Sequence, residues 1–266
     1  MRCAKRLKAA VPAWVELASE LDSRVSARPQ PKLEAADAPA VRDVLAALGR
    51  DGARQLWTQT AEGLRAAPAE CNLVAHFFVA RLYDGASVQV RAHLITRPSE
   101  DVAHSHGASF FSYCLAGRYR HELWRKVPGP GEACYYETVR ATSSTQGSLF
   151  DESVRRPGRF ELDEERTHEH EQRDLYFMDA GDVFHKVCVL QEHMSKGPVV
   201  TLVVRGKRAT FQGSHFVTSG APLAEDVRSH SLGALRDPAE EEAWLGEIEG
   251  QLHEAHGPPG RFRTFE

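Results

Sequence analysis

Histidines at two places in the chain have the spacing of ligands to one metal ion. His104 and His106 stand one residue apart in HSHGASFFSYCLAGRYRHELW, a stretch that predicts a strand, a tight turn at Ala116-Gly117 and a second strand as a hairpin. Alternate residues of a strand point to the same side, so both imidazoles would reach one point inside a barrel. His185, which follows a predicted Gly181-Asp182 turn, is the best candidate for a third ligand. Imidazole ligands of this kind favour a transition metal.

The spacing of the first pair is meaningful only in its context. Thirteen histidines in 266 residues give about 0.6 His-x-His pairs by chance, so the spacing alone is weak. A second pair, His168 and His170, is flanked by acids and arginines, which favours the solvated end of a strand over a second metal site. The first pair differs because it lies in a β-rich stretch with a glycine turn downstream.

Both stretches resemble the two motifs of the cupin superfamily. In the first motif, Gly-x5-His-x-His-x3-4-Glu-x6-Gly, the matching residues are His104, His106 and Gly117, and Phe110 takes the glutamate position. In the second motif, Gly-x5-Pro-x-Gly-x2-His-x3-Asn, the matching histidine is His185. Without the glutamate, the site resembles that of the three-histidine thiol dioxygenases, cysteine dioxygenase and its relatives. This resemblance implies Fe(II) as the cofactor and dioxygen as a co-substrate.

The same resemblance points to two arginines that would hold a substrate carboxylate. FVARLYDG places Arg81 where those enzymes carry a carboxylate-binding arginine. VVTLVVRGKRATFQGSHF looks like their strand after the third histidine, but their Ser-x-His-x-Tyr alternation reads Thr201, Val203, Arg205 here. Arg205 in place of the tyrosine suggests a substrate longer or more acidic than cysteine. Either arginine could alternatively be a surface or salt-bridged residue.

Four further residues could assist a metal centre from neighbouring strands. Tyr119 and His121 share one face of the strand after the Gly117 turn and could act as an acid or orient a ligand, although His121 could be an ordinary strand residue. Arg91 and His93 share one face of the alternating stretch 86–96. For them a solvated face is the simpler interpretation, and a polar barrel interior near the metal is the alternative.

The residues together predict a mononuclear non-haem iron(II) oxygenase that acts on a small thiol or another small anionic metabolite. Two alternatives use the same scaffold. The histidines could bind zinc, nickel or manganese as a Lewis acid for a lyase, isomerase or hydrolase reaction without oxygen. The chain could also be a non-enzymatic cupin that binds a ligand.

Composition favours a soluble cytoplasmic protein. Hydrophobic residues make up 42% and charged residues 26% of the chain, and the formal net charge of −4 gives no electrostatic footprint for nucleic acid. The five cysteines are scattered without a Cys-x-x-Cys pair, which fits a reducing compartment. No stretch approaches the roughly 18 apolar residues of a membrane span, so we expect no membrane contact.

The change of hydrophobic period along the chain predicts three parts. Residues 1–70 form a helical extension, and residues 71–220 form a mainly β, cupin-type β-barrel or jelly roll in which 142–158 is a flexible loop. Residues 221–266 form a C-terminal helix, over about 237–253, and a tail packed on the barrel. The apolar stripe of that helix leaves room for the contacts of a homodimer.

Overall fold

β-strands dominate the computed structural model, and two helices precede them. The structure describes residues 11–50, 72–74, 77–100, 103–127, 134–139, 152–157, 159–180, 183–207, 215–219 and 261–265, together with single positions between 239 and 251. Residues 1–10 and 51–70 of the predicted helical extension, the Gly181-Asp182 turn and the apolar stripe of the C-terminal helix lie outside these residues. The six described positions between 239 and 251 are helical.

The described strands divide into three sheets. The larger sheet has the order β1-β2-β3-β12-β5-β10-β14, with bounds Asn72–Val74, Phe77–Asp84, Val88–Ile95, Val199–Gly206, Phe110–Ala116, Leu175–Met178 and Phe262–Phe265. The smaller sheet has the order β4-β11-β6-β9, with bounds Ser99–Glu100, Phe184–Val189, Arg118–Val127 and Arg159–Glu171. A third sheet, β13-β7-β8, has bounds His215–Ser219, Cys134–Val139 and Glu152–Pro157.

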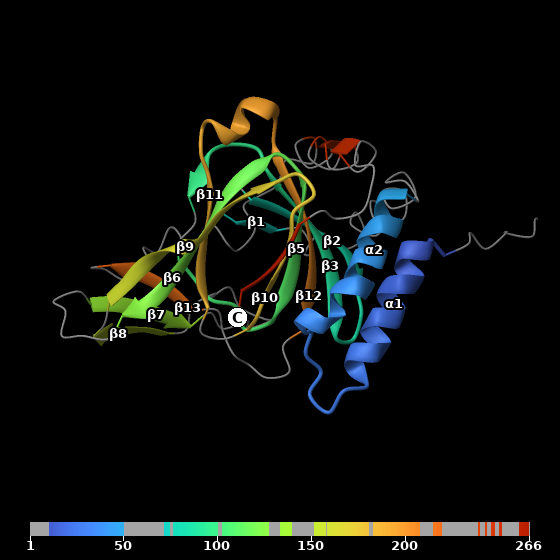
Figure 1. Ribbon diagram of the computed structural model, residues 1–266, viewed down its shortest axis with the longest axis horizontal. Coiled ribbons are helices and arrows are strands. Elements are labelled where there is room, and N and C mark those ends of the chain that lie inside the picture. The colour runs from blue at the N-terminus through green and yellow to red at the C-terminus, as the bar shows by residue number, and fades with distance from the viewer. Residues whose placement is uncertain are drawn as a thin grey trace, which may run out of the picture.

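The order of the strands is that of a jelly roll. The two sheets contain, in chain order, strands β3, β4, β5, β6, β9, β10, β11 and β12, with β7 and β8 of the third sheet between β6 and β9. When they are counted from one to eight, the larger sheet contains the order 1-8-3-6 and the smaller sheet the order 2-7-4-5. This is the two-sheet, double Greek-key arrangement of jelly rolls and cupins. Figure 1 shows the two sheets facing each other, with both helices outside the larger one. The predicted fold class, mainly β with a cupin-type jelly roll, is confirmed.

Three local predictions were wrong. The predicted hairpin does not form, because β5 pairs with β12 and β10 while β6 pairs with β11 and β9 in the other sheet. Gly117, with a φ of 79°, carries the chain between the sheets, and a Cβ there would lie 2.8 Å from the Pro198 carbonyl oxygen. His104 and His106 lie in an extended segment before β5 rather than in a regular strand. Part of the predicted loop 142–158 is β8.

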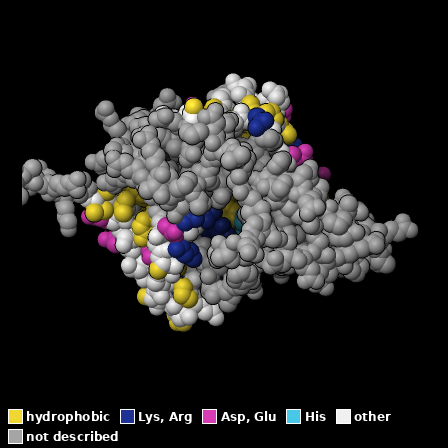
Figure 2. Space-filling view, turned by 180° about the vertical axis from the view of Figure 1, so that it is seen from behind, with side chains coloured by type: hydrophobic (Ala, Val, Ile, Leu, Met, Phe, Trp, Pro, Cys, Tyr) yellow, Lys and Arg dark blue, Asp and Glu magenta, His cyan; other side chains and the backbone are white. Residues whose placement is uncertain are grey.

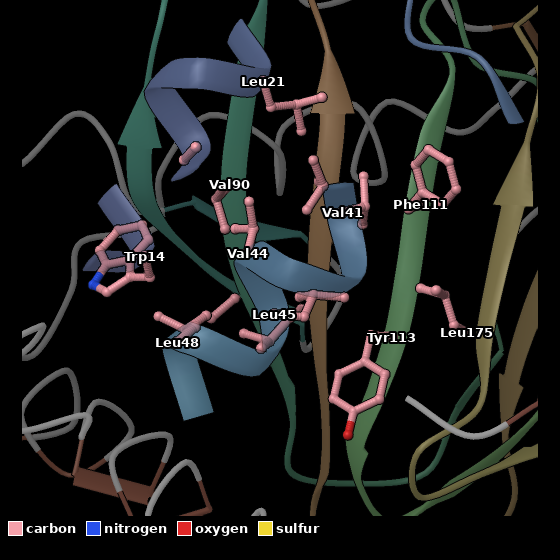
Figure 3. Close-up of a cluster of buried hydrophobic side chains, with 14 of the residues drawn as sticks. Trp14, Leu21, Val41, Val44, Leu45, Leu48, Val90, Phe111, Tyr113 and Leu175 are labelled. Carbon is pink, nitrogen blue, oxygen red and sulfur yellow. The ribbon is translucent and has the colours of Figure 1, made fainter. Parts of the chain in front are cut away.

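The helices cover the outer face of the larger sheet. Helix α1 spans Ala13–Ser26 and helix α2 spans Ala38–Arg50, preceded by the 3-10 turn η1 at Ala35–Asp37. Their apolar stripes pack on alternate residues of the sheet, as Figure 3 shows for Trp14, Leu21, Val41, Val44, Leu45, Leu48, Val90, Phe111, Tyr113 and Leu175. Because strand side chains alternate, the other residues of these strands face the smaller sheet. The larger sheet is thus apolar outside and free to carry polar groups inside.

One buried carboxylate fastens α1 to the turn between β2 and β3. Asp22 accepts hydrogen bonds from the backbone N–H groups of Ala86, Ser87 and Val88, at 2.9, 2.6 and 2.6 Å. A Cβ added at Gly85 would lie 2.4 Å from the Asp22 side chain, so only glycine at this position lets the turn lie this close to the helix. Helix α1 is therefore fastened to the turn that joins β2 and β3.

The C-terminal segment reaches the same sheet. Strand β14 pairs in parallel with β10, and the Leu175 N–H donates to the Arg261 carbonyl at 2.9 Å. The division into parts at residues 70 and 220 stays a prediction. Within the described part of the chain, no helix is both long and apolar enough to cross a membrane.

We expect Asp22→Ala to lower the free energy of unfolding by about 3 kcal/mol, because three buried N–H groups lose a charged acceptor. Urea denaturation of the full chain measures this. The matched control is Asp43→Ala on the exposed face of α2, which should change stability by less than about 0.5 kcal/mol. Equal effects of the two substitutions would contradict the role given to Asp22.

Candidate metal centre

Three histidines converge between the two sheets. The ligand atoms of His104, His106 and His185 all lie within 4.8 Å of one another, and the Nε2 atoms of His106 and His185 are 2.7 Å apart. Metal–nitrogen bonds of about 2.0–2.1 Å at right angles place two ligating nitrogens roughly 3 Å apart. The donor set therefore fits a single transition-metal ion. Among the described residues, this group contains three imidazoles and no carboxylate.

A backbone bridge holds two of these histidines opposite each other. The His104 N–H donates to the His185 carbonyl, and the His185 N–H donates to the His104 carbonyl, both at 2.8 Å. Although 81 positions separate them in the sequence, the two residues form an antiparallel pair at the edge where β4 meets β11. His106 follows two residues later in the extended segment, and its ring centroid is 4.7 Å from that of His104.

A fourth histidine contacts His185, the third candidate ligand, from the smaller sheet. His121 on β6 is fully buried, and its Nε2 atom lies 2.7 Å from Nδ1 of His185. When the His185 proton sits on Nδ1, this nitrogen donates to His121 and leaves the Nε2 lone pair facing His106. A second hydrogen bond of this kind fixes the tautomer and ring orientation of metal-binding histidines. The alternative prediction, that His121 is an ordinary strand residue, does not account for this contact with His185.

Burial lowers the pKa of two histidines at the centre, His185 and His121. The pKa of His185 lies well below its usual value because of burial first, and then because His104, His106 and His121 lie beside it. Burial also lowers the pKa of His121. Neutral imidazole is the form that ligates metals.

Behind His121 lies a buried aromatic and histidine cluster. The Tyr176 ring stacks on His121 at a centroid distance of 4.7 Å and lies 4.8 Å from His170. Tyr119 contacts His170 and hydrogen-bonds Tyr176, so it reaches the three histidines only through other side chains. His170 is 0% exposed. The prediction that it lies at a solvated strand end was wrong, because β9 continues to Glu171 and turns this side chain inward.

An aromatic ring occupies the position of the missing glutamate. Phe110, the first residue of β5, has its ring centroid 4.7 Å from that of His106 and 6.0 Å from that of His185. Only 5% of Phe110 is exposed. The ring therefore forms an apolar wall against the two histidines at the position where the motif has glutamate.

The predicted arginines both lie on the inward face of the larger sheet. Arg205 on β12 is the register partner of Phe110, which places it next to the ring that contacts two of the histidines. Arg81 on β2 is two strands further out, is the register partner of Arg91, and forms a salt bridge with Asp84 at 2.9 Å. Of the two, Arg205 is the one placed beside the centre.

Arg91 and His93 also face the interior, so their interpretation as a solvated face was wrong. In β3 the residues that pack on the helices are Val88, Val90, Ala92 and Leu94, and the alternate residues point the other way. Burial lowers the pKa of His93 to about 3, and the charges of Arg91 and Arg205 lower it further. The sequence pattern showed the alternation but not which face was outside.

Comparisons with known proteins show distant structural likeness. No protein-family model and no curated protein matches the chain. Solved structures similar to part of it include an oxalate decarboxylase of Lactobacillus farciminis in complex with formate, with 12% identity, a TM-score of 0.31, and coverage of 53% of this chain and 31% of that one. An RmlC-like cupin from Methanocaldococcus jannaschii has 10% identity, a TM-score of 0.29, and coverage of 50% and 83%. A DMSP lyase structure has 15% identity, a TM-score of 0.32, and coverage of 80% and 81%. Likeness at this level assigns no activity.

We expect His185→Ala to reduce the metal bound by the purified chain to less than about a tenth of the wild-type amount, because it removes one of three ligands and the bond to His121. Elemental mass spectrometry after loading with a divalent metal measures this. His168→Ala, in the second His-x-His pair, is the control and should bind metal like the wild type. A wild-type chain that binds no metal, or equal binding by both variants, would contradict the site.

Proposed function

We propose that the chain is a mononuclear non-haem iron(II) oxygenase that acts on a small thiol or another small anionic metabolite. The observation that carries this proposal is the group of three imidazoles, which contains no carboxylate among the residues that the structure describes. Three imidazole ligands would hold the ion and would leave open positions on it for substrate and dioxygen. Because the ligands are neutral, a bound ferrous ion keeps its full charge, which favours an anionic substrate.

In this proposal His104, His106 and His185 hold the ion, and bound iron(II) supplies a redox-active centre where dioxygen and substrate meet. Phe110 excludes water from one side of the centre, since its ring packs on two of the ligands. Arg205 orients the substrate by donating to its carboxylate. His121 keeps the proton of His185 on Nδ1.

Oxygen consumption tests the activity directly. The full chain is loaded anaerobically with iron(II) and mixed with oxygen and a panel of thiols, thiol acids and chelating acids. We expect consumption with at least one acidic member, and a rate at least tenfold lower in Arg205→Gln at subsaturating substrate, because a charge-assisted pair is lost. Arg118→Gln, on an arginine whose side chain is 48% exposed and paired with Glu169, is the matched control and should keep the wild-type rate.

Failure of the whole panel would end the oxygenase proposal. Turnover of a substrate by the zinc- or manganese-loaded chain without oxygen would instead support the lyase, isomerase or hydrolase alternative. Ligand binding unchanged in His104→Ala and His185→Ala, with no metal in the wild type, would support a non-enzymatic cupin.

We predict that His121→Phe weakens metal binding by about 10- to 100-fold, because it removes the acceptor that orients His185. A chelator competition measures the affinity. The visible absorption of the cobalt-loaded chain provides a second readout, since a reoriented ligand changes the coordination geometry. His121→Gln, whose amide oxygen still accepts a hydrogen bond, should recover part of the affinity. If His121→Phe binds metal like the wild type, His121 has no positioning role.

The compartment and the assembly remain proposals of the sequence. Cys114 and Cys188 are buried free thiols, which agrees with the predicted reducing, cytoplasmic setting. A homodimer through the C-terminal helix involves residues outside the described part of the chain.

A further inference from the structure

The ring of Phe265 on β14 packs against His121, the histidine that contacts His185. The ring centroids of Phe265 and His121 are 5.1 Å apart with an interplanar angle of 71°, which is an edge-to-face contact. Aromatic rings favour this arrangement at centroid distances of about 4.5–7 Å. Phe265 is 3% exposed and His121 is 0% exposed. In agreement with this burial, almost no histidine surface is visible among the described residues on the face shown in Figure 2.

Ring packing, more than hydrogen bonding, restrains the imidazole of His121. Its Nε2 atom lies 2.7 Å from Nδ1 of His185, but its Nδ1 atom has no hydrogen-bond partner among the residues that the structure describes. Tyr176 stacks on the ring with an interplanar angle of 24°, and Phe265 meets it edge to face. A histidine ring turns over a broad range about the bond to its Cβ when no group packs on it. The Tyr176 and Phe265 rings therefore fix the plane in which His121 presents Nε2 to His185.

Contacts at both ends of β14 hold the backbone that carries Phe265. At one end, Arg261 forms an ion pair with the buried Asp174 at 3.0 Å. At the other end, Phe265 is the register partner of Met178, and its carbonyl accepts from the Asp179 N–H at 3.1 Å. Figure 1 shows this strand, in red, beside β10. The position of the Phe265 ring is therefore set by the larger sheet.

A second phenylalanine of β14, Phe262, lies on the opposite face of the strand. Its ring packs against the outer hydrophobic cluster, 6.1 Å from the ring of Phe111 and 5.5 Å from the Arg42 guanidinium. Phe265 belongs instead to the hydrophobic cluster between the sheets. The alternation of strand side chains accounts for this difference. One short strand thus carries two phenylalanines, of which Phe265 is the one that contacts His121.

We propose that Phe265 is a positioning residue of the candidate metal centre. It holds the ring of His121, and His121 holds the imidazole of His185. Groups that support a metal-binding histidine from behind set its orientation, and loosening them lowers the affinity for the metal. Strand β14, which lies 80 positions after His185 in the sequence, thus contributes to the centre without providing a ligand. This inference rests on the metal centre of the proposed function, but it requires neither iron nor oxygen.

Zinc affinity of the full chain, measured by competition with a chelator, tests this role. We expect Phe265→Leu to weaken zinc binding at least about threefold and to change the visible absorption of the cobalt-loaded chain, because the His185 ring loses part of its support. Phe262→Leu is the matched control, since it removes the same ring from the other face of the same strand. It should keep zinc affinity within about twofold of the wild type and leave the cobalt spectrum unchanged. Urea denaturation shows that each variant is folded, and Phe265→Met, which keeps most of the volume without the flat ring, replaces a leucine variant that is not.

A double-mutant cycle shows whether Phe265 acts through His121. In the His121→Phe background, Phe265→Leu should change zinc affinity by less than about twofold, because the ring that it positions is already replaced. Wild-type affinity in Phe265→Leu, an equal loss in Phe262→Leu, or the same loss with and without His121 would overturn the inference. A wild-type chain that binds no metal would overturn both this inference and the metal centre. Phe265-dependent metal binding in a chain that consumes no oxygen would remove only the proposed oxygenase function.

Discussion

The reciprocal backbone hydrogen bonds between His104 and His185 are the constraint on which the centre depends. They join an extended segment before β5 to the start of strand β11, so two candidate ligands from distant parts of the sequence are held by the same N–H and carbonyl pairing that builds the smaller sheet. With the backbone fixed, side-chain rotation alone decides where the imidazoles point. The contact with His121 restricts the rotation of the His185 ring. The centre is therefore positioned by the backbone first and by side chains second.

The two faces of the larger sheet differ. The outer face packs on the helices, and the inner face carries polar side chains. The outer face packs on α1 and α2, and Asp22 ties the first helix to the β2–β3 turn with three backbone hydrogen bonds. The inner face combines a second hydrophobic cluster, which includes Ile95, Val199 and Val203, with arginines, a histidine and a threonine. The packing of the outer face on the helices stabilises the sheet that carries these polar groups.

Local periodicity in the sequence predicted most strands and the three histidines, but not the pairing of the strands. The alternation in 110–127 is the same whether two strands form a hairpin or lie in opposite sheets, and only the close packing of Gly117 on Pro198 distinguishes the two. The acids and arginines around His170 suggested solvent, yet Glu169 and Glu171 occupy the alternate face of β9 while the histidine is buried. Arg91 and His93 were misread for the same reason. A strand with one apolar and one polar face does not reveal which face is interior when helices cover the apolar side.

The interior therefore has two chemically different walls. The smaller sheet contributes His185, His121 and His170, which are buried imidazoles suited to bind and orient around a cation. The larger sheet contributes Arg91 and Arg205, which attract anions, and Phe110 separates the two sets. The side chains on the two walls therefore differ in kind, because strand alternation directs a different set of polar residues into the interior from each sheet.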